Sequence, residues 1–111
     1  MKQINFKQIG SQGKIDGILR IKGKELYFKF NNSSYANQII SQMREKGAII
    51  EEGKGWIKVD LFHGINEGDV KFGDIQVDIN ETSDEDFEEV LTKFYEKKYI
   101  ESKFIVEVKE I

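Results

Sequence analysis

Apolar and polar residues alternate with a period of two along most of this chain. Such alternation predicts half-buried strands, because successive side chains of a strand point to opposite faces of a sheet. Glycine-containing turns separate several of these segments, as at Gly23-Lys24 between Ile21 and Leu26. We therefore expect antiparallel strands over residues 4–6, 15–21, 26–30, 48–52, 56–62, 70–72, 75–79 and 104–108.

Two segments depart from this alternation and place apolar residues at helical spacing instead. The first follows the capping side chains of residues 31–34 and ends at Gly47, where a left-handed residue ends a helix without strain. The second follows Thr82 and Ser83, either of which is a suitable cap. The apolar stripes are Tyr35, Ile39, Ile40 and Met43 in the first helix and Phe87, Val90, Leu91 and Phe94 in the second.

The length and composition indicate one soluble domain. The chain has 111 residues, of which 39% are hydrophobic and 33% charged, and it has no cysteine to form a disulfide or a thiolate zinc site. The N-terminus carries no apolar run, so we expect a cytoplasmic protein without a membrane segment. We predict a single α+β domain over residues 1–111, in which an antiparallel sheet of about six strands packs against two amphipathic helices.

Two alternatives concern the arrangement of these elements. Residues 14–52 and 56–111 both read as strand, strand, helix and strand, which suggests a ββαβ pseudo-repeat. Chance similarity between two stretches rich in Ile, Lys and Glu is the competing explanation. A winged helix is the rival fold, but strands occupy the region where its first helices should lie.

The chain contains no recognisable catalytic, metal or cofactor motif. Residues 10–14 (Gly-Ser-Gln-Gly-Lys) lack the spacing of a phosphate-binding loop. The one histidine, His63, lies near Asp60 and Glu67, but this spacing matches no established zinc site. An enzyme that uses these three residues is therefore the weakest of our functional hypotheses, and we expect no metal and no cofactor.

Acidic residues gather at the start of the second helix. The positive end of the helix dipole accounts for most of them through stability alone. On a helical projection Glu85, Glu89 and Glu96 lie opposite the apolar stripe, so they predict an outward acidic ridge on a rigid helix. A ridge of this kind suits a basic groove on another protein. The predicted partner-binding residues are Glu85, Glu88, Glu89, Glu96 and Trp56.

A second candidate surface involves aromatic and basic residues of two strands. Trp56 and Lys58 alternate with apolar residues of one strand, and Tyr27 and Lys29 do so in another. Exposed aromatics beside lysines stack single-stranded bases or anchor protein interfaces. Burial of Trp56 under a second layer is the alternative. Tyr27, Lys29, Trp56 and Lys58 are thus the predicted residues of an alternative single-stranded nucleic-acid-binding surface.

The favoured function is non-catalytic protein binding. With 17 basic and 20 acidic residues the net charge is −3, which argues against coating duplex DNA by bulk charge. A lysine- and isoleucine-rich composition is typical of AT-rich genomes. We therefore predict a small inhibitor or immunity-type protein of phage or mobile-element origin that binds a basic partner, such as a nuclease, stoichiometrically. The oligomeric state is open, since the last strand, residues 104–111, has the pattern of an edge that pairs with a second copy.

Overall fold

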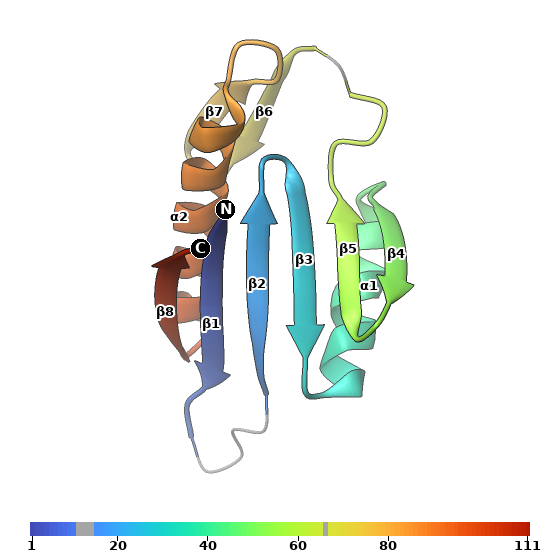
Figure 1. Cartoon of the computed structure of the whole chain (residues 1–111), viewed down its shortest axis with the longest axis vertical. Coiled ribbons are helices and arrows are strands. Elements are labelled where there is room, and N and C mark those ends of the chain that lie inside the picture. The colour runs from blue at the N-terminus through green and yellow to red at the C-terminus, as the bar shows by residue number, and fades with distance from the viewer. Residues whose placement is uncertain (11–14, 66) are drawn as a thin grey trace.

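The computed structural model describes residues 1–10, 15–65 and 67–111 of the chain. Over these residues the chain forms eight strands and two helices, drawn in Figure 1. This confirms the α+β fold class that the alternation predicts. In chain order the elements are β1 (Lys2–Gln8), β2 (Asp16–Lys22), β3 (Glu25–Phe30), α1 (Ser33–Glu45), β4 (Ile49–Gly53), β5 (Trp56–Asp60), β6 (Asp69–Phe72), β7 (Ile75–Asp78), α2 (Asp84–Glu101) and β8 (Phe104–Glu110).

Six strands form one antiparallel sheet, which we call the main sheet. Their order is β4-β5-β3-β2-β1-β8, so the last strand of the chain lies beside the first (Figure 1). In the described chain β6 and β7 pair only with each other, at one end of the molecule. The predicted sheet of about six strands with two helices is confirmed. The winged-helix alternative is wrong, because three strands of the main sheet, β1, β2 and β3, precede α1 where that fold requires helices.

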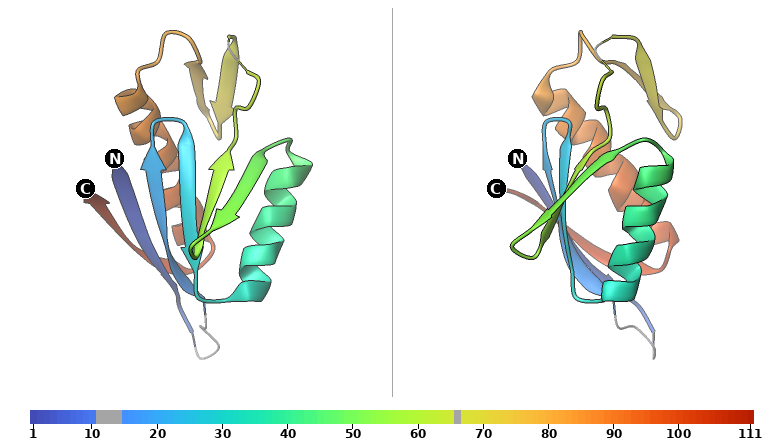
Figure 2. Two further views of the ribbon diagram at one scale, coloured as in Figure 1. Left: turned by 45° about the vertical axis from the view of Figure 1, so that its right-hand side comes forward. Right: turned by 90° about the vertical axis from the view of Figure 1, so that its right-hand side faces the viewer.

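Both helices cover the same face of the main sheet, as the two views of Figure 2 show. The strand register aligns the apolar residues of this face: Ile4 lies beside Leu19, and Leu19 lies beside Phe28. Burying such side chains is the main source of stability, at roughly 25 cal/mol per Å² of apolar surface. The opposite face has neither helix on it, and we call it the open face. Ile4, Phe6, Leu19, Ile21, Leu26, Phe28, Val59, Phe87 and Leu91 form the centre of the core.

The ends of α1 follow the predicted capping chemistry. The side chain of Asn32 accepts a hydrogen bond from the backbone N–H of Tyr35, at 2.9 Å. At the other end Gly47 has a φ of 86°, and its N–H donates to the carbonyl of Arg44 at 3.0 Å. Glycine at this position therefore lets the chain leave the helix and enter β4.

The apolar face of α2 is wider than the sequence predicts. Phe87 and Leu91 are fully buried, as expected, but the buried line continues to Tyr95 and Tyr99. Val90 and Phe94 lie half-buried at the flank of this line. The reason is that α2 crosses β2, β1 and β8, so its second half also faces the main sheet.

The ββαβ order is present in both halves of the chain, but the pairing of the strands is not repeated. β2 and β3 lie inside the main sheet, whereas β6 and β7 form a separate sheet. β4 pairs with β5, and β8 pairs with β1. The segments 14–52 and 56–111 therefore both contain the ββαβ order, which β5 precedes in the second segment, but their strands pair differently. Residue 14 itself, and with it most of the glycine-containing segment 10–14, lies outside the described residues.

Candidate functional site

One end of the molecule carries a concentration of negative charge. Residues 67–89 contain ten acidic residues and one basic residue, Lys71, whereas the rest of the chain contains 16 basic and ten acidic residues. This segment comprises β6, β7, the connection to α2 and the first turns of α2. These elements lie together at the upper end of Figure 1. We call residues 67–89 the acidic lobe.

Local hydrogen bonds set the backbone of the acidic lobe. Gly73, with a φ of 62°, occupies the turn between β6 and β7. The carboxylate Oδ1 of Asp78 accepts hydrogen bonds from the N–H groups of Asn80, at 2.8 Å, and Glu81, at 3.0 Å. This turn ends β7 at Asp78, so the predicted strand is shorter than expected and Ile79 lies beyond it.

The second helix begins at Ser83 and not at the other predicted cap, Thr82. The side-chain oxygen of Ser83 accepts a hydrogen bond from the N–H of Asp86 at 3.1 Å. Asp84, Glu85 and Asp86 then form the first turn, where the helix dipole favours negative charge. The cap therefore fixes where α2 begins and places these three acids in its first turn.

Apolar side chains attach the acidic lobe to the main sheet. Phe72, Ile79 and Phe87 are buried and belong to the same core as the strands. The ring of Phe72 lies 5.7 Å from that of Phe62, which follows β5. Ile75 of β7 is exposed, whereas Val70 and Val77 of the same hairpin pack against the core. The lobe is thus held by a few buried residues beneath a charged surface.

The acids of the lobe other than Glu88 have no ion pair among the described residues. Among the described residues, no lysine or arginine forms an ion pair with any of them. Asp69 lies directly opposite Asp78 in the β6–β7 ladder, and like charges in that position destabilise a sheet. Within the lobe, the exposed acids of the connection and of α2 are Glu81, Asp84, Glu85, Asp86 and Glu89.

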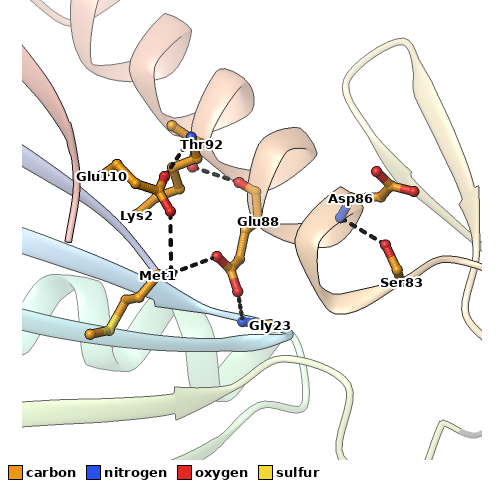
Figure 3. Close-up of polar contacts among 8 residues, drawn as sticks. All are labelled: Met1, Lys2, Gly23, Ser83, Asp86, Glu88, Thr92 and Glu110. Atoms are coloured by element: carbon orange, nitrogen blue, oxygen red, sulfur yellow. Dashed lines mark hydrogen bonds and ion pairs between the residues drawn. The ribbon is translucent and has the colours of Figure 1, made fainter.

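Glu88 differs from its neighbours, as Figure 3 shows. Its carboxylate lies 3.0 Å from the amino group of Met1 and accepts a hydrogen bond of 2.9 Å from the N–H of Gly23. The side chain is only 12% exposed. The backbone carbonyl of Glu88 also accepts a bond from the hydroxyl of Thr92. Glu88 therefore joins α2 to the β2–β3 turn, and its carboxylate points inward, unlike those of Glu85 and Glu89.

Glu96 lies outside the acidic lobe. The structure leaves it half-buried, because the buried face of α2 extends past the predicted stripe to Thr92 and Tyr99. Lys93, which is exposed, lies between Glu89 and Glu96 along the helix. Of the predicted ridge, Glu85 and Glu89 are thus brought together with other acids, and Glu96 is not.

The residues of the second predicted surface lie together on the open face. Tyr27 pairs directly with Lys58 across β3 and β5. The half-buried ring of Trp56 has the Nζ of Lys29 5.6 Å from its centroid and the Cζ of Arg20 4.7 Å from it. Because β3 separates β5 from β2, the indole reaches across β3 to meet Arg20. Arg20 is not among the predicted residues of this surface, although it lies on the polar side of the second predicted strand.

Lys58 and Glu25 of this surface compensate each other. The Nζ of Lys58 lies 3.3 Å from the carboxylate of Glu25, and the Tyr27 hydroxyl donates a hydrogen bond to the same carboxylate. The Tyr27 hydrogen bond, followed by that from Lys58, lowers the pKa of Glu25, and Glu25 in turn raises the pKa of Lys58. This surface therefore has cations and anions side by side, in contrast with the acidic lobe.

The third predicted cluster is only partly assembled. The Nδ1 of His63 lies 3.6 Å from Asp60, and the histidine side chain is 63% exposed. Asp60 also accepts a hydrogen bond from the N–H of Phe62, which ends the strand at Asp60 and turns the chain. Glu67 is exposed at the start of the acidic lobe. Within residues 1–10, 15–65 and 67–111, no three His, Cys, Asp or Glu side chains are arranged to hold a metal ion.

The acidic lobe as a whole was missed by the sequence analysis, which found only the helical acids. Asp69, Asp74 and Asp78 precede the helix in a separate hairpin, and only the fold brings them to the same end. A count of charge along the chain is the signal that finds them.

None of the described helices has the length and apolar character needed to cross a bilayer. Comparison with protein families, curated proteins and solved structures finds no match to this chain.

Proposed function

We propose that this protein is a non-catalytic binding module that attaches stoichiometrically to a positively charged protein through the acidic lobe. The segregation of charge supports this proposal: ten acids against one lysine in residues 67–89, in a chain whose remainder is net positive. A surface of one sign raises the rate of encounter with an oppositely charged surface and disfavours other partners.

The helix dipole does not account for all of this charge. It stabilises acids in the first turn of α2, and Asp78 accepts the backbone hydrogen bonds of the turn after β7, but Asp69 and Asp74 lie in the hairpin without such a role. The pairing of Asp69 with Asp78 works against the hairpin. Residues that lower stability locally are typical of functional surfaces, where binding requires them.

The partner class follows from the same chemistry. A protein that binds nucleic acid has a basic groove, and a rigid acidic surface fits such a groove. We therefore favour an inhibitor or immunity-type role against a basic nucleic-acid-handling enzyme, such as a nuclease, with a phage or mobile element as the source.

A pair of variants with equal net charge tests the proposal. In the lobe variant, Glu81, Glu85 and Glu89 become glutamine; in the body variant, the exposed Glu45, Glu52 and Glu101 become glutamine. Each immobilised protein is incubated with a lysate of a low-GC bacterium, with and without nuclease treatment, and the retained proteins are quantified.

We expect the wild-type chain and the body variant to retain the same basic protein in about equal molar amount, and the lobe variant to lose it. Equal retention by both variants contradicts a role for the acidic lobe. Retention that disappears on nuclease treatment contradicts protein binding and favours nucleic acid.

Single-stranded nucleic-acid binding is a second candidate, favoured by the position of Tyr27, Lys29, Trp56 and Lys58 on one uncovered face. A hollow of about 510 Å³ adjoins this group and is lined in part by Lys7, Ile18 and Ile105. A mixed-sequence oligonucleotide should then quench the fluorescence of Trp56, with strong salt dependence. Unchanged oligonucleotide affinity in the Trp56→Ala and Tyr27→Ala variants would rule this function out.

A further inference from the structure

β8 is an unprotected edge of the main sheet. It is a regular strand of seven residues, and no described strand pairs with its outer side. Three apolar side chains of this segment are unusually exposed: Ile105 is 62% exposed, Val108 38% and Ile111 49%. Such an edge presents free backbone groups that pair readily with another strand.

The other edge of the main sheet is different. β4 is shorter, ends in Gly53, and carries the adjacent exposed acids Glu51 and Glu52. Charges and short length are the usual devices that prevent edge pairing. The structure therefore offers one edge, β8, that is suited to association.

The hydrogen bonds to β1 show which backbone groups of β8 are free. The N–H of Ile111 donates to the carbonyl of Met1 at 3.0 Å, and the carbonyl of Lys103 accepts from the N–H of Ile9 at 2.9 Å. In an antiparallel strand, backbone groups of alternate residues point to opposite neighbours. The odd-numbered residues therefore bond β1, and the N–H and C=O groups of Phe104, Val106, Val108 and Glu110 point outward.

We propose that two copies of this chain associate through antiparallel pairing of β8 with β8, around a two-fold axis at Val108. In this register Val108 faces Val108 of the second copy, and the two residues exchange both backbone hydrogen bonds. Glu107 then faces Lys109 of the other copy, and Ile105 faces Ile111. Each of these contacts occurs twice because the interface is symmetric.

Charge and burial select this register over its neighbours. An axis at Glu107 places two glutamates directly opposite each other, which destabilises the pair. An axis at Val106 places Glu107 against Ile105 and leaves the exposed Ile111 uncovered. Only the axis at Val108 joins opposite charges and covers the three exposed apolar side chains at the same time.

The dimer goes beyond the proposed function and has a defined shape. The two main sheets continue into each other, and both open faces lie on the same side, because the two-fold axis is perpendicular to the sheet. The acidic lobes lie at opposite ends, since the paired strands run in opposite directions. One dimer therefore presents two separate acidic lobes.

A charge-exchange cycle tests the register by sedimentation equilibrium of the full chain. Glu107→Lys places lysine against lysine at both symmetric positions, and Lys109→Glu places glutamate against glutamate. We expect each single variant to weaken dimerisation about tenfold. The double variant Glu107→Lys/Lys109→Glu restores the opposite charges and should restore wild-type affinity. Within one chain the Glu107–Lys109 contact of 3.4 Å is retained in the double variant, and the neighbours of both residues on β1, Asn5 and Gln3, are uncharged.

A backbone variant provides an independent test. Val108→Pro removes an outward N–H that β1 does not use, so the monomer should keep its circular dichroism spectrum while the dimer is lost. A wild-type chain that stays monomeric overturns the proposal, and the strand of another protein is then the candidate partner of this edge. A dimer that persists in Val108→Pro overturns it as well. If the double charge variant fails to recover what the single variants lose, the register is wrong.

Discussion

The acidic lobe and the rest of the molecule, which we call the body, differ in the balance and pairing of their charged residues. In the body, basic and acidic side chains are interspersed and some form ion pairs: Lys58 with Glu25, Lys2 with Glu110 and Lys97 with Glu101. In the lobe the acids have no basic side chain as a partner within the described chain, and two of them face each other. The body therefore mixes charges of both signs, whereas the lobe concentrates charge of one sign, of which only part, as at Asp78 and Glu88, has a role within the fold.

The two regions nevertheless share one core. Phe87 belongs to the lobe and is fully buried. The centroid of its ring lies 5.8 Å from that of Phe62 and 5.1 Å from the Nζ of Lys24. Tyr95 and Tyr99 extend the same buried line into the body. We therefore expect substitutions of buried apolar residues to lower the stability of both regions, and charge substitutions to have different effects on stability in the lobe and in the body.

The largest expected effect comes from Phe87→Ala. It removes a fully buried ring at the junction of lobe and body, and we expect the free energy of unfolding to fall by about 3–5 kcal/mol. Denaturant unfolding measures this loss. Phe94→Ala, at a half-buried position of the same helix, should cost clearly less. Equal losses at the two positions would mean that the lobe is not anchored through Phe87.

Alkaline pH should destabilise the body through its tyrosines. Burial raises the pKa of Tyr95 and of Tyr99 in the folded chain above the ordinary value of 10.0. Their neutral forms therefore contribute stability that is complete below pH 10 and is lost as the pH rises above it. Each tyrosine should lower the free energy of unfolding by about 1.4 kcal/mol per pH unit in that range. Tyr95→Phe should reduce this slope, and an unchanged slope would contradict the burial of that hydroxyl.

The cap of α2 is expected to have a smaller effect. Ser83→Ala removes the acceptor for the N–H of Asp86 and should lower stability by about 1 kcal/mol. Thr82→Ala is the matched control, because its side chain does not cap the helix. Thermal unfolding of both variants distinguishes the two positions, and a greater loss in Thr82→Ala would reverse our assignment of the cap.

Neutralising a hairpin acid of the lobe should stabilise the protein slightly. Asp69→Asn removes the repulsion from Asp78 and keeps an oxygen for the hydrogen bond from Gln76, so we expect a gain of about 0.2–1 kcal/mol. Glu25→Gln is the contrasting change in the body, where it removes a paired carboxylate and should lower stability. Chemical denaturation of the two variants tests the contrast, which fails if Asp69→Asn is the more damaging change.

Much of the fold could be predicted from local patterns. The period-two alternation identified the strands, and Asn32 and Gly47 marked the ends of α1, because these signals depend on neighbouring residues. The separation of β6 and β7 from the main sheet could not be predicted, since it depends on which apolar faces meet in space. The burial of Tyr95 and Tyr99 also depends on where α2 crosses the sheet.

The candidate site was predictable only in part. Glu85 and Glu89 were identified from helical spacing, and both are exposed in the lobe. Glu88 shares their sequence environment, but its contacts with Met1 and Gly23 come from distant parts of the chain. Arg20 meets Trp56 for the same reason, since β2 and β5 are separated in sequence and neighbours of β3 in space.

Binding through the acidic lobe is tested most directly by the rate of association with the basic protein that the wild-type chain captures. Stopped-flow measurements at low and high salt compare the wild type, the lobe variant and the body variant. We predict that the lobe variant associates about tenfold or more slowly at low salt, that salt narrows the difference, and that the body variant behaves as wild type. Equal slowing of both variants would show that only net charge matters and would contradict a binding role for the acidic lobe.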